Sequence, residues 1–211
     1  RTFTINNIMV EIKHLYTGSK HTIVSFSSIG NTIQGVNREF YNLKNNGYNV
    51  IWVLDHNKSY FSAIDINEIT KHIKTYKVYA IGNSMGGFNA IMFSNFYPTQ
   101  KVLAFSPQFS MDKTIVPWED RWRKQITWKK FKYPKATFVN WTDYCLITGH
   151  KAKDQKHMSM MPDTPNINKQ TVFGGHVIAE KFKKSGNLYR LINDYFKEDV
   201  EITEQYLQSL L

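Results

Sequence analysis

A glycine-rich stretch, Gly82-Asn83-Ser84-Met85-Gly86-Gly87, constrains the fold of this chain more than any other feature. It follows an apolar run at residues 78–81 and leads into a helix-like run at residues 88–93. A G-x-S-x-G pattern between a strand and a helix is typical of a turn so tight that the serine backbone is strained and its hydroxyl is presented at the end of the strand. The pattern predicts that Ser84 is a nucleophile at the edge of a β-sheet. The alternative is a glycine-rich turn without chemistry.

The length and composition fit one globular domain. The 211 residues, of which 42% are hydrophobic, are enough to bury a sizeable core. No apolar run approaches the roughly 20 residues of a membrane span, and no signal-peptide pattern is found at the start. Because the sequence starts at Arg1, it can be a piece of a longer product, and a missing leader carries little weight. The single cysteine, Cys145, cannot form an internal disulfide, which favours a cytoplasmic location.

The charge is strongly positive. The formal net charge of +10 arises from 27 Lys and Arg against 17 Asp and Glu. Such a balance attracts anionic partners: nucleic acid, acidic lipid headgroups or an acidic polysaccharide. The positive residues are spread along the chain, with one denser region at residues 121–135. Signatures of nucleic-acid-binding modules are absent, so we expect no nucleic-acid partner. The simplest explanation of the charge is a lysine-rich solvated surface.

Expected strands and helices alternate along the chain. Strands are expected at residues 2–5, 8–15, 21–26, 48–54, 78–81, 101–105, 144–148 and 170–173. Helices are expected at residues 36–45, 66–73, 85–97 and 177–196. Short loops join the two kinds of element. This order predicts an α/β fold with a doubly wound, mostly parallel sheet, as a single domain over residues 1–197.

Two segments stand outside this alternation. Residues 107–142 hold four of the five tryptophans, and we expect a small Trp-rich, cap-like insertion there: Trp118, Trp122, Trp128 and Trp141. Residues 198–211 place apolar side chains at helical spacing, which predicts a C-terminal helical tail. The tail docks on the body, forms a subunit contact in an oligomer, or continues into a longer chain. The sequence leaves these three alternatives open.

A serine nucleophile needs a general base, and His176 is the expected one. It follows an expected strand through Gly174-Gly175 and directly precedes the last expected helix. The two glycines let the loop bend, so that the imidazole can reach back over the sheet edge to Ser84. The alternative is a surface histidine that caps a helix.

The base in turn needs a carboxylate that orients it, and Asp154 is the expected acid. It lies in the loop beyond the strand at residues 144–148. Asp143 precedes that strand and would lie at the wrong end of a parallel sheet. Asp163 is farther along and is the fallback. The alternative for Asp154 is a solvated loop carboxylate.

Backbone donors for an oxyanion are expected at two places. The N–H of Met85 lies at the expected helix start, where unpaired donors and the helix dipole favour negative charge. The second donor is expected after the strand at residues 21–26, from Ser27 or Ser28, with Ser27 preferred.

Other side chains at the same edge are candidates for binding substrate. Asp55 ends an expected strand and either binds substrate or caps the following turn. Aromatic faces stack on sugar rings, and an arginine can hold a carboxylate or phosphate. We therefore expect Trp118, Trp122 and Arg121 to bind substrate, with Arg123 as the alternative arginine. The tryptophans equally fit the packing face of a small helical cap.

A metal site is the rival interpretation of one histidine cluster. His150, Asp154 and His157 lie close together in sequence. They lack a helical His-x-x-x-His pair and a defined set of three or four ligands, so we expect no metal.

With Ser84, Asp154 and His176 placed, the chain resembles the α/β-hydrolase superfamily over nearly its full length. Within it, the pattern is similar to small bacterial glycan-modifying serine enzymes, such as capsular-polysaccharide O-acetyltransferases and the acetyltransferase component of accessory secretion systems. The Trp-rich insert departs from the pattern. The stretches that carry the resemblance are Ser25-Phe26-Ser27, Leu54-Asp55, Gly82-Asn83-Ser84-Met85-Gly86-Gly87 and Gly174-Gly175-His176.

The resemblance implies an α/β-hydrolase-like fold and an acyl group that passes through Ser84 to water or to a sugar hydroxyl. The expected enzyme is a serine esterase or O-acyltransferase that acts on O-acetyl esters of a carbohydrate. It needs no cofactor, with acetyl-CoA as the acyl donor if it is a transferase. The expected partners are a small ester or acidic glycan substrate and, peripherally, a membrane complex. The alternative is a non-catalytic binding module on a hydrolase scaffold.

Overall fold

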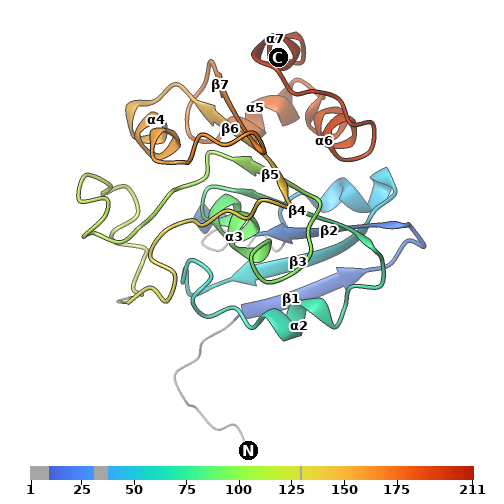
Figure 1. The fold of residues 1–211 in the computed structure, drawn as a ribbon, viewed down its shortest axis with the longest axis horizontal. Coiled ribbons are helices and arrows are strands. Elements are labelled where there is room, and N and C mark those ends of the chain that lie inside the picture. The colour runs from blue at the N-terminus through green and yellow to red at the C-terminus, as the bar shows by residue number, and fades with distance from the viewer. Residues whose placement is uncertain (1–9, 31–37, 129) are drawn as a thin grey trace, which may run out of the picture.

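The fold is built on a seven-stranded sheet with strand order β1-β3-β2-β4-β5-β6-β7 (Figure 1). The computed structural model describes residues 10–30, 38–128 and 130–211. Every pairing in the sheet is parallel except that of β1 with β3. The strands are β1 (Val10–Leu15), β2 (His21–Phe26), β3 (Asn49–Asp55), β4 (Lys77–Asn83), β5 (Lys101–Phe105), β6 (Asp143–Gly149) and β7 (Ile167–Val172). The predicted mostly parallel sheet is confirmed.

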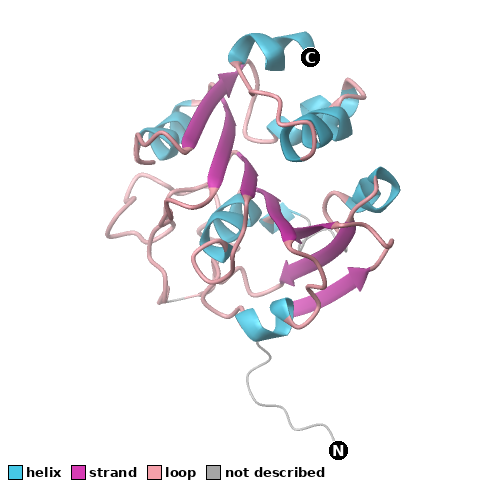
Figure 2. Ribbon diagram, turned by 45° about the vertical axis from the view of Figure 1, so that its right-hand side comes forward, coloured by secondary structure: helices cyan, strands magenta, loops and turns pink. Residues whose placement is uncertain are grey.

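Helices cover both faces of the sheet (Figure 2). One face packs against α2 (Ile66–Thr70), α3 (Met85–Phe93) and α4 (Ala152–Ser159). The other packs against the 3₁₀ helix η1 (Tyr41–Asn46), α5 (Ile178–Lys184), α6 (Leu188–Phe196) and α7 (Glu204–Ser209). Alternate residues of β3 serve the two cores, with Trp52 on the α6 side and Ile51 and Val53 on the α3 side. The central strands are buried on both faces, which is why their sequences read as continuous apolar runs.

The strands at residues 21–26 and 101–105 coincide with their predictions, whereas several helices differ. The helix predicted at residues 177–196 is two helices, because Gly186 has φ of +81° and ends the first. The helix after Ser84 ends at Phe93 and continues only as turns. The helix predicted at 36–45 is a 3₁₀ helix that starts at Tyr41, and its predicted first residues lie outside the described ones. The strand predicted at 2–5 also lies outside them.

The 107–142 segment, between β5 and β6, consists of turns and loops in its described residues, without a helix or strand. Several of its apolar side chains pack against the α3 side of the sheet, among them Trp122, Phe131 and Tyr133. The segment thus closes this side of the molecule as an irregular layer, and the small helical cap considered from the sequence is not formed.

The C-terminal tail docks on the body, which is one of the three alternatives that the sequence left open. Ile202, Leu207 and Leu210 are buried in the core shared with α5 and α6. The Asn168 side chain on β7 donates to the carbonyl of Ile202 over 2.7 Å. The tail therefore covers the end of the sheet at β7.

Two further observations concern the predicted location. In the part of the chain that the structure describes, no helix has the length and apolar character to cross a membrane. Cys145 lies fully buried in the middle of β6, and burial raises the pKa of its thiol.

Candidate active site

The turn between β4 and α3 is as tight as its glycines predict. Ser84 has φ of +58° and ψ of −119°, a strained conformation for a residue with a side chain. A Cβ on Gly82 would lie 2.1 Å from the backbone of Gly86, and one on Gly86 would lie 2.2 Å from the carbonyl oxygen of Phe26. The Ser84 N–H donates to the Phe105 carbonyl over 2.8 Å. Backbone contacts with β2 and β5 therefore fix where the Ser84 side chain points.

Ser84, His176 and Asp154 form one hydrogen-bonded line. Ser84 Oγ lies 2.8 Å from His176 Nε2, and His176 Nδ1 lies 2.8 Å from Asp154 Oδ1. Since a carboxylate accepts only, Nδ1 carries the proton and Nε2 is free to accept the Ser84 hydroxyl proton. Ser84 and Asp154 are buried, and His176 is partly exposed. The three residues that the sequence placed on separate segments are brought together by the fold.

Each partner comes from the end of a different strand. Asp154 lies in the first turn of α4, after β6, rather than in the loop expected from the sequence. His176 lies between β7 and α5. The two loops hold each other, because the His150 N–H donates to the Gly174 carbonyl and the Gly174 N–H donates to His150 Nδ1. A Cβ on Gly149 would lie 2.4 Å from the Gly175 carbonyl oxygen, so close packing here also requires glycine.

A buried ion network lies behind Asp154. Arg121 Nη1 donates to Asp154 Oδ1 over 2.6 Å, and the same guanidinium binds Glu119 through Nε and Nη2. His157 Nδ1 accepts from the Phe109 N–H, so its Nε2 carries the proton and donates to Glu119 Oε2 over 3.0 Å. Glu119, Asp154 and His157 are all at most 3% exposed. Arg121 is thus engaged with protein groups. The sequence had predicted instead that it binds substrate.

The network sets the ionisation of its members. Burial raises the pKa of Asp154, but the hydrogen bond and charge of His176 and then those of Arg121 outweigh it and lower the pKa below its ordinary value. Burial likewise raises the pKa of Glu119, and the hydrogen bonds from His157 and Arg121 bring it well below its ordinary value. Burial lowers the pKa of His157. Both carboxyl groups are therefore ionised at neutral pH, and His157 is neutral.

The two backbone N–H groups that the sequence predicts as oxyanion donors differ in their hydrogen bonding. Met85 is the first residue of α3 and is fully buried, and its N–H makes no hydrogen bond within the described residues. The Ser27 N–H, by contrast, donates to the Val53 carbonyl over 3.0 Å, which extends the β2–β3 pairing. The prediction that Ser27 is the second donor is therefore wrong, because its N–H is already engaged. The neighbouring Ser28 N–H donates to Glu39 Oε2 over 2.6 Å.

Other predicted residues take structural positions. Asp55 is fully buried, and its Oδ2 accepts from the Ser59 N–H and hydroxyl, as expected for the turn-capping alternative. Asp163, the fallback acid, is 88% exposed and pairs with Lys169. Asp143 lies at the start of β6, as its place in the sequence indicated.

The histidine cluster is arranged for hydrogen bonds within the protein. Both ring nitrogens of His157 are occupied, and His150 Nδ1 accepts a backbone N–H. Among the described residues, no group of three or more His, Cys, Asp or Glu side chains is arranged to hold a metal ion.

The two tryptophans lie at different distances from the reacting groups. The Trp122 ring centroid is 6.0 Å from that of His176, so Trp122 borders the site. The Trp118 ring packs against His157 at 4.7 Å, beneath the Lys156 ammonium. Trp118 thus covers the ion network, whereas Trp122 lies beside His176.

Gln108 is a site residue that the sequence analysis missed. Its Oε1 lies 3.2 Å from Ser84 Oγ and accepts from the Tyr60 hydroxyl over 3.3 Å. It follows β5, the strand beside β4, so its position after Ser106-Pro107 was an available signal. Glu119 lies in the irregular 107–142 segment and carried no such signal. His157 lies in α4 and was considered from the sequence only as a metal ligand.

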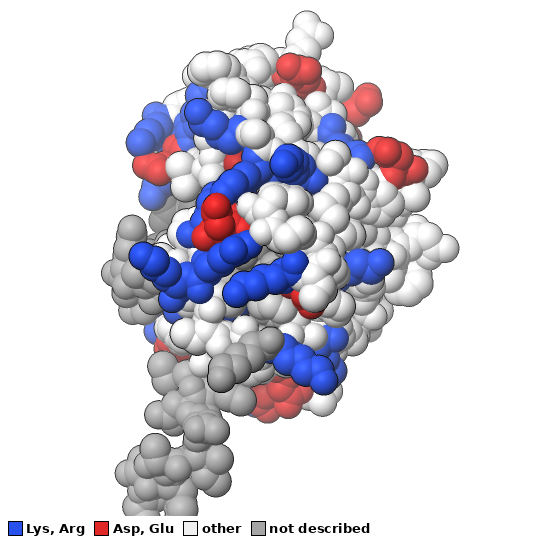
Figure 3. All heavy atoms as spheres, turned by 90° about the vertical axis from the view of Figure 1, so that its left-hand side faces the viewer, with Lys and Arg blue, Asp and Glu red and all other residues white. Residues whose placement is uncertain are grey.

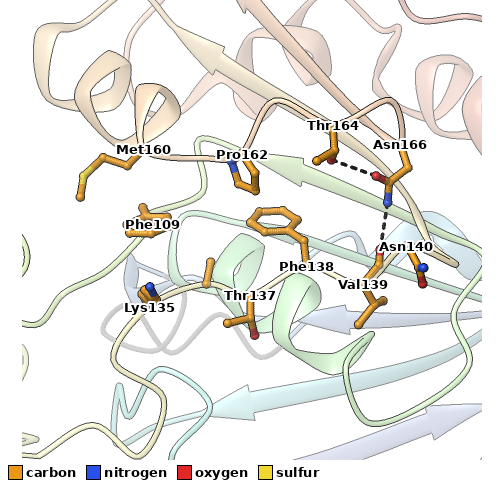
Figure 4. Close-up of a pocket in the computed structure, with 11 residues that line it drawn as sticks. Phe109, Lys135, Thr137, Phe138, Val139, Asn140, Met160, Pro162, Thr164 and Asn166 are labelled. Carbon is orange, nitrogen blue, oxygen red and sulfur yellow. Dashed lines mark hydrogen bonds between the residues drawn. The ribbon is translucent and has the colours of Figure 1, made fainter.

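A cavity of about 1000 Å³ opens next to Ser84 and His176. Their chain neighbours Asn83 and Val177 line it, together with Ser28, Arg38 and Lys183. A smaller hollow of about 420 Å³ lies between the 107–142 segment and the loop after α4 (Figure 4). Its wall includes Phe138 and Pro162 but no residue of the Ser84–His176–Asp154 line. The wall of the larger cavity does not include these three residues either, but it reaches the chain neighbours of two of them.

Solved structures share this fold at low sequence identity, whereas no family model and no curated protein sequence matches the chain. A carboxylesterase structure from Nitrososphaera gargenis has a TM-score of 0.62 at 14% identity and covers 94% of this chain and 99% of its own. The capsule O-acetyltransferase of Neisseria meningitidis serogroup A has a TM-score of 0.57 at 14% identity, covering 86% and 92%. The carboxylesterase CesB from Bacillus subtilis has a TM-score of 0.52 at 13% identity, covering 89% and 92%. The predicted architecture is confirmed: the chain has an α/β-hydrolase-like fold.

Proposed function

We propose that this protein is a serine enzyme that transfers acyl groups through an acyl-enzyme on Ser84. The observation that carries the proposal is the line from Ser84 Oγ through His176 to Asp154, with both contacts at 2.8 Å. Its proton order is the one that general-base activation of a serine requires.

In the proposed reaction, His176 Nε2 accepts the hydroxyl proton as Ser84 Oγ bonds to the acyl carbon. The carbonyl oxygen becomes an oxyanion and accepts a hydrogen bond from the Met85 N–H at the start of α3. The bond to the leaving oxygen then breaks, and the proton on His176 passes to that oxygen. Asp154 holds the ring in one tautomer and stabilises its charged form.

The second half of the cycle consumes the acyl-enzyme. Water or a sugar hydroxyl gives its proton to His176 Nε2 as its oxygen bonds to the acyl carbon. The bond between that carbon and Ser84 Oγ then breaks, and the proton on His176 passes to Ser84 Oγ. With water the product is an acid, and with a sugar hydroxyl it is a new O-acetyl ester. The similarity of fold to a protein named as a capsule O-acetyltransferase supports an acetyl group and a carbohydrate, with acetyl-CoA as the donor in the transfer case.

Charge on the face of the site supports an acidic carbohydrate. Lys and Arg side chains gather on the face that carries α4 and the 107–142 segment (Figure 3). The exposed ones in the described part of this region include Lys113, Arg123, Lys124, Lys130, Lys132, Lys135, Lys151 and Lys156. A positive face beside a catalytic cavity raises the local concentration of an anionic chain.

The decisive experiment measures acetate release from 4-nitrophenyl acetate, with and without an oligosaccharide acceptor. We expect Ser84→Ala to lower kcat by at least about 10³-fold while the fold is retained. An acceptor that receives acetyl groups identifies a transferase, and unchanged acetate release identifies an esterase. Full activity in the Ser84→Ala variant would overturn the mechanism.

A fluorophosphonate probe separates the enzyme from the alternative, a non-catalytic binding module. We expect the probe to label Ser84 in the wild-type protein and to leave the alanine variant unlabelled. Added salt should weaken the reaction with an acidic oligosaccharide but leave 4-nitrophenyl acetate hydrolysis unchanged, because only the charged acceptor is steered by the surface.

A further inference from the structure

The Arg121 guanidinium makes five polar contacts, which connect the 107–142 segment to the proposed triad. Nε and Nη2 bind the two oxygens of Glu119, at distances from 2.6 to 3.1 Å. Nη1 donates to Asp154 Oδ1 over 2.6 Å and lies 3.3 Å from His176 Nδ1. Because Nδ1 carries a proton when it faces Asp154, this last contact is between two donors that share one acceptor oxygen.

We propose that Arg121 is a positioning residue for the triad, which fixes Asp154 against His176, and that Glu119 offsets its charge. This role rests on the proposed function. It also means that the 107–142 segment supports the proposed catalytic relay, the hydrogen-bonded pair of Asp154 and His176, on the side of Asp154 away from Ser84.

Both Arg121 and Glu119 are needed for this role. Asp154 Oδ1 accepts from His176 and Arg121, whereas Oδ2 has no hydrogen-bond partner among the described residues. The guanidinium therefore helps to decide which oxygen faces the imidazole. An arginine alone would cancel the carboxylate charge that the imidazolium needs in the transition state. Glu119 restores a net charge of one negative unit to the group.

Glu119 is itself fixed by a neutral histidine. The Phe109 N–H occupies His157 Nδ1, so the Nε2 proton points at Glu119 Oε2. His157 thus supplies a hydrogen bond without adding a positive charge. Among the described residues, the charged groups around this network include Arg123, which donates to the Glu119 carbonyl, and Lys156, whose ammonium lies over the Trp118 ring. The pair of Asp120 and Lys153 lies farther out, toward solvent.

The test is the pH dependence of kcat/KM for 4-nitrophenyl acetate in two variants of opposite charge effect. Arg121→Met removes a positive charge beside the relay, so the acid limb should move to higher pH by on the order of one unit. Glu119→Gln keeps the shape of the side chain and leaves the Arg121 charge without its partner. Its acid limb should move to lower pH. Opposite shifts are expected only from an electrostatic role.

A lysine variant separates geometry from charge. Arg121→Lys keeps a positive charge but loses the two-sided fork, so the acid limb should stay near that of the wild type. We expect kcat to fall about 10- to 100-fold, with little change in KM, because the acid is misplaced by a fraction of an ångström.

Arg123→Met is the matched control. Arg123 donates to the carbonyls of Glu119 and Pro117 and so holds the same turn, but it makes no contact with the triad. Its acid limb should not move. If Arg121→Met and Glu119→Gln gave the same limb as Arg123→Met, the positioning role would be wrong while the acyl-enzyme mechanism stood. If Arg121→Met did not fold, the isosteric Glu119→Gln variant would still decide. Full activity in the Ser84→Ala variant would instead overturn the acyl-enzyme mechanism itself.

Discussion

Ser84 and the pair formed by His176 and Asp154 are held in place by different forces. Ser84 sits on a turn where backbone packs against backbone, with no space for a single added carbon at Gly82 or Gly86. Asp154 and His176 lie on loop and helix ends that are joined by hydrogen bonds and by buried charges from Arg121. The first half is rigid because of steric exclusion, and the second because of paired charge. We therefore expect the first to fail when atoms are added and the second when charges are removed.

Gly86→Ala should have the largest effect. The new Cβ would lie 2.2 Å from the Phe26 carbonyl oxygen, and a backbone oxygen at the end of β2 cannot move aside without disturbing the sheet. We expect no folded protein, or a free energy of unfolding lower by more than about 3 kcal/mol, measured by thermal and urea denaturation.

The control for that variant is Gly175→Ala, since a Cβ there meets no heavy atom within 4 Å. It should melt close to the wild type. Equal melting temperatures of the two variants would show that the close backbone contact at Gly86 does not limit the stability of the protein.

Asp154→Asn tests the relay without adding atoms. An amide cannot hold the Nδ1-protonated tautomer of His176 as a carboxylate does, so kcat should fall by about 10³- to 10⁴-fold while circular dichroism stays unchanged. Asp163→Asn is the control, because Asp163 is 88% exposed and pairs with Lys169 rather than with His176. A comparable loss in the control would remove Asp154 from its proposed role.

Acid should destabilise the protein through the buried charges around Asp154. The pKa values of Glu119 and Asp154 are lowered in the folded state, so the unfolded chain takes up their protons more readily as the pH falls. Stability from these groups is present above their ordinary pKa values near 4 and is lost below them. The buried His157 acts in the same direction, beginning below about pH 6.5, because its folded pKa is lowered and only the unfolded chain binds the proton there.

Urea denaturation at pH 7, 5, 4 and 3 measures that dependence. We expect the free energy of unfolding to fall steeply on acidification in the wild type and less steeply in Glu119→Gln. Parallel curves for the two proteins would show that Glu119 does not carry the effect.

Asp120→Asn should have the smallest effect. Asp120 follows Glu119 in the chain and pairs with Lys153, but this pair is exposed to solvent. Exposed pairs contribute little because water already solvates both charges. The melting temperature should therefore remain that of the wild type, in contrast to Glu119. A large fall would mean that the outer surface of the segment, rather than its buried charges, holds the relay in place.

The same division decides what the sequence could predict. The turn at Ser84 is a local pattern, and the strands around it are continuous apolar runs, so both could be located without coordinates. His176 could be placed because glycines and a helix start mark its loop. The positions of Ser84 and His176 in the fold could therefore be predicted from local sequence and chain order.

The charged partners could not be predicted in the same way. Glu119, Arg121 and His157 lie far apart from Ser84 in sequence and share no period or motif, and only the fold reveals that they are paired. Arg121 was expected to face a ligand because a lone arginine gives no indication of an internal partner. Ser27 was expected to offer a free N–H because an extended strand and its end look alike in sequence, whereas its N–H continues the pairing with Val53.

The burial of Cys145 in the middle of β6 makes this chain report on its own opening. A thiol with a raised pKa and no solvent contact is shielded from alkylating and disulfide reagents as long as the sheet is intact. Labelling by such a reagent would then proceed only through excursions that expose the central strands, and its rate would count them. No engineered probe is needed, since the sequence contains a single cysteine.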